Sequence, residues 1–249
     1  MSLPAGLSLT WFGHSTFLIR LPNGKRLLID PFLKGNPVCP PERKEIAALG
    51  PVDLLLVTHG HSDHFADAIE VAKTFGCPVA ANYEILSYMG TQGVENIEPM
   101  NKGGSVTRAD LGLTITLTHA FHSSTITTDS GTINAGEPCG FVVSTEDDSG
   151  RPFAFYFAGD TAVFSDMALI SELYSPSLAF LPIGDRFTMG PREAAKAVTL
   201  MSSVDSVVPM HYGTFGLLTG TPEAFRQALA DAESGVRVLV FEPGETQEF

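Results

Sequence analysis

Four side chains of metal-ligand type fall within six positions, and this cluster constrains the chain more than any other feature. His59 and His61 alternate along an extended segment, so their side chains share one side of it. A turn then brings Asp63 and His64 round towards them. Imidazole nitrogens beside a carboxylate are typical ligands of zinc, iron or manganese. The segment therefore predicts a metal site; the alternative interpretation is a solvated loop or a single packed histidine.

The residues on either side of the cluster predict how it is held. Residues 52–57 are almost all apolar, which is typical of a buried strand, and the cluster follows directly. Residues 65–75 carry apolar side chains at the helical period, and Gly76 stops the predicted helix. The candidate ligands thus lie between a strand end and a helix.

Strands come first along the chain, and strands and helices alternate towards its end. Two packed sheets with helices on their outer faces satisfy this order, which predicts an α/β fold, a four-layer αββα sandwich. We expect residues 1–249 to form a single domain, because a sandwich of this length commonly does. The remaining expected strands are 7–12, 15–21, 25–29, 79–81, two within 105–117, 140–144, 153–158, 178–181, 206–208 and 236–241, and the remaining expected helices are 83–89, 167–173, 191–201 and 222–231.

Residues 120–138 form a long polar stretch with little periodicity. Loops of this length in a compact domain are usually functional or disordered. Because the stretch adjoins a candidate histidine, we expect it to form a lid over the site. Within this stretch, Phe121, Ile126 and Ile133 are the lid residues that would form an apolar wall.

The net charge indicates which kind of substrate the chain can bind, and the cysteines indicate whether it contains disulfides. The chain has 15 basic and 28 acidic residues and a net charge of −13, which disfavours a large nucleic-acid surface. Two divalent cations would still attract a small anionic group, so we expect a small-molecule substrate. Cys39, Cys77 and Cys139 form no close pair and no CxxC motif, and packed thiols are the simpler interpretation.

Location follows from what the sequence lacks. No stretch reaches the roughly 18–20 apolar residues of a membrane span. The first residues show no basic region followed by an apolar core, the pattern of a secretory signal. We therefore expect a cytoplasmic protein with no membrane partner. A homo-oligomer is left open.

The pattern His59-x-His61-x-Asp63-His64 resembles the HxHxDH signature of the metallo-β-lactamase fold superfamily. The segments AFHSS at 120–124, GDT at 159–161 and IGDRFTMGP at 183–191 resemble those of a group of uncharacterised metal-dependent hydrolases related to the ascorbate-6-phosphate lactonases. The resemblance covers nearly the whole chain. It implies a hydrolase that holds two divalent metal ions, with Zn²⁺ expected first and Mn²⁺ or Fe²⁺ as alternatives.

The resemblance also implies which residues bind the two ions. In this superfamily the HxH pair and a later histidine bind one ion, the DH pair and a last histidine bind the other, and an aspartate bridges them. The later histidine is expected at His122 rather than His119, because the AFHSS segment resembles the ligand-bearing one. A helix cap for Asp160 and a surface loop for His211 are the alternative interpretations. Carried onto this chain, the ligands are His59, His61, Asp63, His64, His122, Asp160 and His211.

Three more residues are candidates for roles beside the metals. Asp30 resembles an aspartate that supports the ligand histidines by hydrogen bonding, and an Asp-Pro turn is its alternative. His14 resembles a histidine near the metals, and its hypothetical role is to stabilise an oxyanion or protonate the leaving group. Asp185 either positions substrate or a ligand histidine, or caps the helix that starts at Pro191.

The expected reaction is attack of metal-activated water on an ester, lactone or phosphodiester bond of a small molecule. Asp63 is the candidate base, which would orient the water and accept its proton as well as bind metal. The redox branch of the same fold carries a glutamate at the position of His61, which disfavours it here. A nucleic-acid phosphodiesterase or nuclease of the same fold and a non-enzymatic metal-binding protein remain the alternatives.

Overall fold

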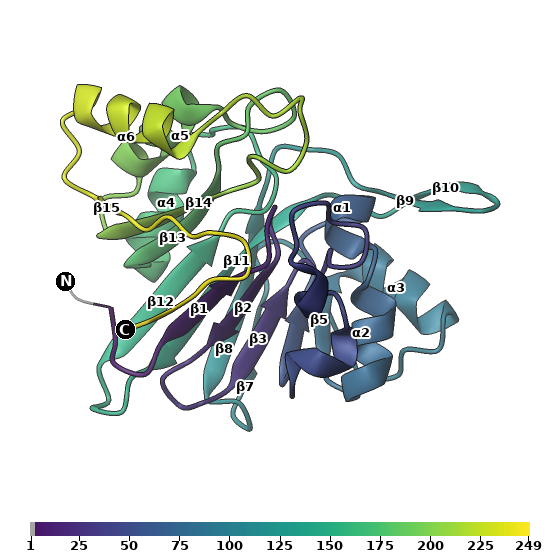
Figure 1. Ribbon diagram of the computed structural model, residues 1–249. Coiled ribbons are helices and arrows are strands. Elements are labelled where there is room, and N and C mark those ends of the chain that lie inside the picture. Colours follow the sequence, from purple (N-terminus) through teal and green to yellow (C-terminus); the bar gives the residue numbers. More distant parts are fainter. Residues whose placement is uncertain (1–2) are drawn as a thin grey trace.

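Two seven-stranded sheets face each other across a shared apolar core, and helices lie on the outer face of each (Figure 1). The computed structural model describes residues 3–249. Alternate side chains of each strand point into the core. Phe17 of the first sheet packs against Phe157 and Phe180 of the second, with ring centroids 6.1 and 4.9 Å apart. This order of layers confirms the predicted αββα sandwich.

The first sheet has the strand order β16-β1-β2-β3-β4-β5-β6. Its first four strands pair antiparallel, and β3 to β6 pair parallel. Parallel β3 and β4 therefore end at the same edge, where Asp30 and the histidine cluster follow them. The strands are β1 (Ser8–Trp11), β2 (Phe17–Arg20), β3 (Arg26–Ile29), β4 (Leu54–Leu56), β5 (Val79–Asn82), β6 (Ile97–Met100) and β16 (Thr246–Glu248).

The second sheet has the order β15-β14-β13-β12-β11-β8-β7. Its strands β12 to β15 run parallel, so Asp160 after β12 and His211 after β14 leave the sheet at one edge. The strands are β7 (Ser105–Arg108), β8 (Leu113–His119), β11 (Cys139–Glu146), β12 (Pro152–Phe157), β13 (Leu178–Pro182), β14 (Ser206–Met210) and β15 (Arg237–Val238).

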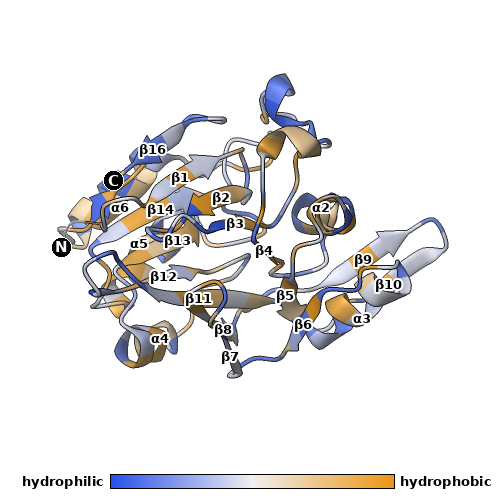
Figure 2. Cartoon of the chain, turned by 90° about the horizontal axis from the view of Figure 1, so that it is seen from below, coloured by the Kyte–Doolittle hydropathy of each residue, from blue (hydrophilic) through white to orange (hydrophobic). Residues whose placement is uncertain are grey.

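The helices fall into two groups, one for each sheet. In the view of Figure 2, α2 and α3 lie on the side of the first sheet formed by β4 to β6, while α4 to α6 lie with the second sheet. Within the described residues, none of the helices has the length and apolar character needed to span a membrane. The helices are α1 (Ser62–Phe65), α2 (Ala68–Phe75), α3 (Tyr83–Thr91), α4 (Met167–Tyr174), α5 (Pro191–Leu200) and α6 (Pro222–Asp231), and short 3-10 helices occupy η1 (Pro41–Arg43) and η2 (Ile46–Leu49).

Two predicted elements differ from the structure, and two strands of the first sheet were not predicted. The helix expected over 65–75 is divided between α1 and α2, because the buried Asp67 at the break accepts hydrogen bonds from the backbone N–H groups of Leu33 and Lys34. The strand expected over 236–241 is only two residues long. Strands β6 and β16 were not predicted, since the first contains a proline and the second has only three residues.

The polar stretch 120–138 contains regular structure, contrary to prediction. Strands β9 (Thr125–Thr128) and β10 (Gly131–Asn134) form an antiparallel hairpin that projects from the body of the molecule (Figure 1). Its base is anchored in the core below α2 and α3 by Ile126 and Ala135. The β-branched residues of the hairpin explain why this polar sequence still forms strands.

Candidate metal centre

The seven predicted ligands come together at one edge of the two sheets. His59 and His61 follow β4, and Asp63 and His64 lie on the short helix α1. The loops after β8, β12 and β14 bring the others, which are His122, Asp160 and His211.

One group within the cluster consists of three histidines. His59, His61 and His122 offer ring nitrogens that all lie within 4.8 Å of one another. Nε2 of His59 is 3.1 Å from Nδ1 of His61, and the His122 ring lies across from both. Three imidazole nitrogens that converge in this way form a suitable cradle for a transition-metal ion.

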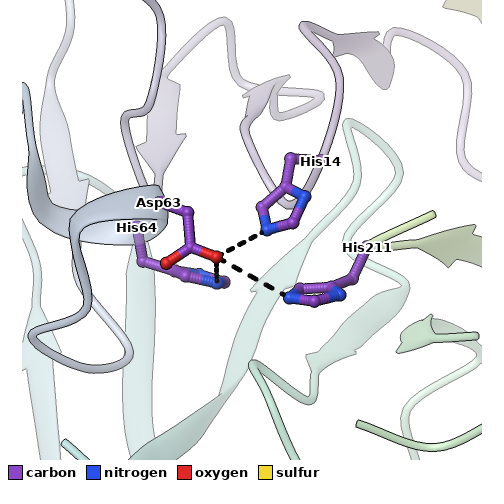
Figure 3. A group of neighbouring side chains, drawn as sticks. All are labelled: His14, Asp63, His64 and His211. Carbon is purple, nitrogen blue, oxygen red and sulfur yellow. Dashed lines mark hydrogen bonds and ion pairs between the residues drawn. The ribbon is translucent and has the colours of Figure 1, made fainter. Parts of the chain in front are cut away.

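A second group lies beside the first and contains His14, Asp63, His64 and His211 (Figure 3). Oδ2 of Asp63 is the common point of this group. It is 3.9 Å from Nε2 of both His64 and His211, and 3.0 Å from Nε2 of His14. The group thus joins the DH pair of the signature to the last histidine.

Asp160 lies between the two groups. Its Oδ2 is 3.0 Å from His211 Nε2 and 3.3 Å from His64 Nε2, both in the second group. The same oxygen is 3.6 Å from His122 Nε2 and 3.9 Å from His59 Nε2, both in the first. A single carboxylate oxygen therefore faces both histidine groups, as the expected bridging role of Asp160 requires.

Of the two candidate histidines after Leu117, the structure brings only His122 into the cluster. The His119 ring packs against Phe121, with centroids 4.3 Å apart, and its Nδ1 lies 3.2 Å from the ammonium of Lys102. Strand alternation and the turn after β8 separate the two rings. His119 therefore belongs to the surroundings of the site and not to either ligand group.

Asp30 and Thr58 fix the orientation of two histidines. The Asp30 carboxylate accepts hydrogen bonds from the Thr58 backbone N–H at 2.8 Å and from the Thr58 hydroxyl at 2.7 Å, and it lies 2.8 Å from His64 Nδ1. His64 Nδ1 donates to this carboxylate, which turns Nε2 towards the cluster. The predicted support of a ligand histidine by Asp30 is thus present.

The Thr58 hydroxyl also fixes the orientation of His59 in the first group. Its proton is donated to Asp30, so its oxygen is free to accept from Nδ1 of His59, 3.0 Å away. Nε2 of His59 is then the unprotonated nitrogen, and it faces the cluster. One threonine therefore sets the tautomer of His59 while it orients the aspartate behind His64.

His14 is buried and both of its ring nitrogens are engaged. Burial and the neighbouring His211 together lower its pKa to about 4, so the ring is neutral near pH 7. Nε2 donates to Asp63, and Nδ1 accepts from the Thr214 hydroxyl at 3.0 Å. This geometry makes His14 a support for Asp63.

The electrostatic environment and the unpartnered atoms of the cluster fit bound cations. Burial opposes the charged forms, but His211 and His64 hold the pKa of Asp160 well below its usual range. Likewise Asp160 and Asp30 raise the pKa of His64 well above its usual value, although burial alone would lower it.

Three polar atoms of the cluster are buried without a hydrogen-bond partner, namely His64 Nε2, Asp160 Oδ1 and His211 Nδ1. Buried polar atoms left unpaired are costly, and cations held by His64 Nε2 and Asp160 would relieve much of that cost.

Backbone geometry at the site is unusual. His14, Asp30 and His211 have φ values of 58°, 48° and 57°, the left-handed region that side chains with a Cβ rarely adopt. Gly60 lies between the HxH histidines, where a Cβ would come within 2.8 Å of side-chain atoms of Ile126 and Ala135. The base of the β9–β10 hairpin therefore rests directly on the ligand loop.

Within the described residues, the Asp185 side chain forms no hydrogen bond or ion pair with a candidate ligand histidine and does not cap α5. Its carboxylate accepts from the Arg186 backbone N–H at 2.7 Å and from the Thr219 hydroxyl at 3.4 Å. The side chain thus joins the loop after β13 to the loop that carries Thr219. Thr58 and Thr214 were missed by sequence reasoning, because a threonine carries no signal of its own without the contact.

Comparison with known proteins matches this geometry to a family. The family described as "Beta-lactamase superfamily domain" matches residues 25–212. A "UPF0173 metal-dependent hydrolase" of Rubrobacter xylanophilus is 53% identical over 241 residues, 96% of each chain. Another, of Methanopyrus kandleri, is 46% identical over 97% of this chain and 100% of its own.

Solved structures agree with the sequence matches. A metallo hydrolase of the archaeon Ignicoccus hospitalis has a TM-score of 0.84 and 36% identity over 98% of each chain. An isothiocyanate hydrolase from Delia radicum gut bacteria shares the fold at a TM-score of 0.75 and 22% identity, over 97% of this chain and 99% of its own. The chain therefore belongs to the beta-lactamase superfamily and, within it, to the UPF0173 metal-dependent hydrolases.

Proposed function

We propose that this chain uses two divalent metal ions to hydrolyse an ester, lactone or phosphodiester bond of a small molecule. The observation that carries the proposal is the position of Asp160 Oδ2 between two groups of ligand nitrogens. Those nitrogens belong to His59, His61 and His122 on one side and to His64 and His211 on the other, where Asp63 is a further member of the second group. This donor set suits Zn²⁺ best, and Mn²⁺ or Fe²⁺ fits the same donors.

The chain's own residues supply orientation and proton transfer. Bound ions of this kind acidify water and polarise the oxygen that is attacked. Asp63 is the carboxylate of the cluster that faces solvent, with 27% of its side chain exposed against 3% for Asp160. Although burial raises the pKa of Asp63, the hydrogen bond from His14 and the charge of His64 bring it below the usual range. Asp63 is therefore ionised near pH 7 and able to orient water and accept a proton.

His14 acts through Asp63 in this proposal. Its Nε2–H holds the oxygen that also faces His64 and His211, and Thr214 holds the opposite side of the ring. An oxyanion or leaving-group role for His14 would require this hydrogen bond to break. We therefore assign His14 as a positioning residue for the base.

A small molecule is favoured over a nucleic acid as substrate. The net charge of −13 opposes long-range attraction of a phosphate backbone. Phe215 packs on His14 with ring centroids 5.5 Å apart, and 39% of its surface is exposed. An exposed aromatic ring beside the ligand group offers a contact for an apolar part of a substrate.

Metal analysis combined with a substrate panel tests the proposal. We expect the purified protein to carry up to two divalent ions per chain and to hydrolyse at least one member of a panel of esters, lactones and phosphodiesters. Chelation should abolish turnover, and Zn²⁺ or Mn²⁺ should restore it. Turnover of single-stranded RNA alone would favour the nuclease alternative. A protein that stays metal-free and inert after reconstitution contradicts the proposal.

Replacing Asp30 by asparagine tests how the ligands are held. The amide lacks the charge and the second acceptor oxygen that bind Thr58 and His64, so both histidine orientations are weakened. We expect metal affinity to fall by roughly 10–100-fold. Competition with a chromogenic chelator measures this affinity, and exposed Asp110→Asn is the matched control. Equal affinity in the two variants would show that Asp30 has no positioning role.

A further inference from the structure

A cavity of about 360 Å³ on the outer face of the first sheet concentrates positive charge away from the metal centre. It is lined by three arginines, Arg20, Arg26 and Arg43, although the whole chain has only 15 basic residues against 28 acidic ones. Arg26 begins β3 and Asp30 follows the last residue of that strand, so roughly 13 Å of extended chain separates the cavity from the partner of His64. The cavity is thus a separate site.

The strand register makes this concentration of charge unfavourable on its own. Arg20 on β2 lies directly opposite Arg26 on β3. Like charges in direct cross-strand positions destabilise a sheet. Burial lowers the pKa of Arg26, and Arg20 lowers it further although Asp53 acts in the opposite sense. The two guanidinium groups therefore lie where an anion would be stabilised.

The nearby carboxylates leave most guanidinium N–H donors of the three arginines available to bind a ligand. Glu248, three-quarters exposed, lies 3.3 Å from Arg20. Asp53 binds the Lys25 ammonium and the backbone N–H of Arg26, while the Arg26 guanidinium donates to the Leu49 carbonyl. Within residues 3–249, the guanidinium of Arg43 has no hydrogen bond or ion pair with another residue. The charge of Arg43, which lines the cavity, is thus not paired with another side chain of these residues.

The rest of the lining suits an organic anion. The hydroxyl residues Ser8, Thr10 and Thr246 lie on β1 and β16 beside Arg20, and Ser8 is its direct cross-strand neighbour. Phe12 and Leu18 add an apolar floor. Guanidinium groups present paired N–H donors that match the oxygens of a phosphate group.

We propose that this cavity is a second ligand site, which binds a small phosphate-bearing molecule through Arg20, Arg26 and Arg43. Inorganic phosphate and an organic phosphate share the anionic group, and they differ in their use of the apolar floor. The proposal does not depend on the reaction at the metal centre.

Calorimetric titration of the metal-loaded protein with inorganic phosphate and with phenylphosphonate tests this site. We expect saturable binding that Arg43→Gln and Arg20→Gln each weaken about tenfold or more. Arg192→Gln, an exposed change on α5, is the matched control and should bind as the wild type does. Tighter binding of phenylphosphonate identifies an organic phosphate as the occupant, and equal binding identifies free phosphate.

The metal centre is the competing location for either anion, and the same variants separate the two. Both arginine changes lie outside the ligand groups, so binding at the metals would be unaffected by them. Metal content and thermal unfolding of each variant establish that the centre and the fold are intact. Wild-type affinity in both arginine variants, or no binding to the wild-type protein, overturns the proposal.

Discussion

Replacing Asp160 by asparagine is expected to lower turnover by about a thousandfold, which corresponds to roughly 4 kcal/mol of transition-state stabilisation. The amide keeps the size of the side chain but loses the negative charge that faces His211, His64 and His122. In the proposed two-ion centre, the two cations would then lack their shared counter-charge. Steady-state kinetics on a substrate from the panel and metal content by mass spectrometry measure the effect.

The stability of the same variant separates loss of the site from loss of the fold. The wild-type metal-free protein places Asp160 among several imidazoles, at 3% side-chain exposure. A thermal unfolding transition close to that of the wild-type apo-protein would show that Asp160→Asn folds. A folded variant that still holds two ions and turns over at the wild-type rate would rule out a bridging role.

The second large effect is expected from His122→Ala, with His119→Ala as its matched control. His122 lies across from His59 and His61, whereas His119 contacts Lys102 and Phe121 outside the cluster. We expect His122→Ala to lose one of two bound ions and about a thousandfold in turnover, since the first group keeps only two histidines. His119→Ala should retain both ions.

Metal content and turnover of the two variants, measured side by side, decide between the histidines. Both substitutions remove an imidazole within the same short stretch of chain, so a general disturbance of this segment would affect them alike. A loss of metal from His119→Ala with His122→Ala unaffected would reverse the assignment.

The candidate ligands were predicted from the resemblance of short segments to the HxHxDH signature and its companion segments, and the structure explains why they meet, because the loops that carry them leave the sheets at one edge. Parallel strands end at a common edge, so residues as far apart as His59 and His211 meet there without any contact being known. The αββα order followed from the same alternation of strands and helices. These parts of the prediction depend on patterns a few residues long.

Features that depend on distant contacts were not predictable in this way. Residues 65–75 keep an unbroken helical period, yet Asp67 interrupts the helix because it binds backbone groups of Leu33 and Lys34. Thr214 reaches His14 across 200 positions of sequence. The hairpin of β9 and β10 was read as irregular, because its threonines hide the alternation of a strand behind a polar composition.

The left-handed backbone at His14, Asp30 and His211 concentrates conformational strain at the edge of the sheets that carries the site. Each such conformation costs roughly 1–3 kcal/mol, and here all three surround Asp63 and His64. Glycine would remove the strain but also the side chain that the site needs. The strand ends that carry the chemistry therefore lower stability, and the aromatic core between the sheets must compensate for them. Random substitutions that raise thermal stability should accordingly gather at this edge and inactivate the enzyme there.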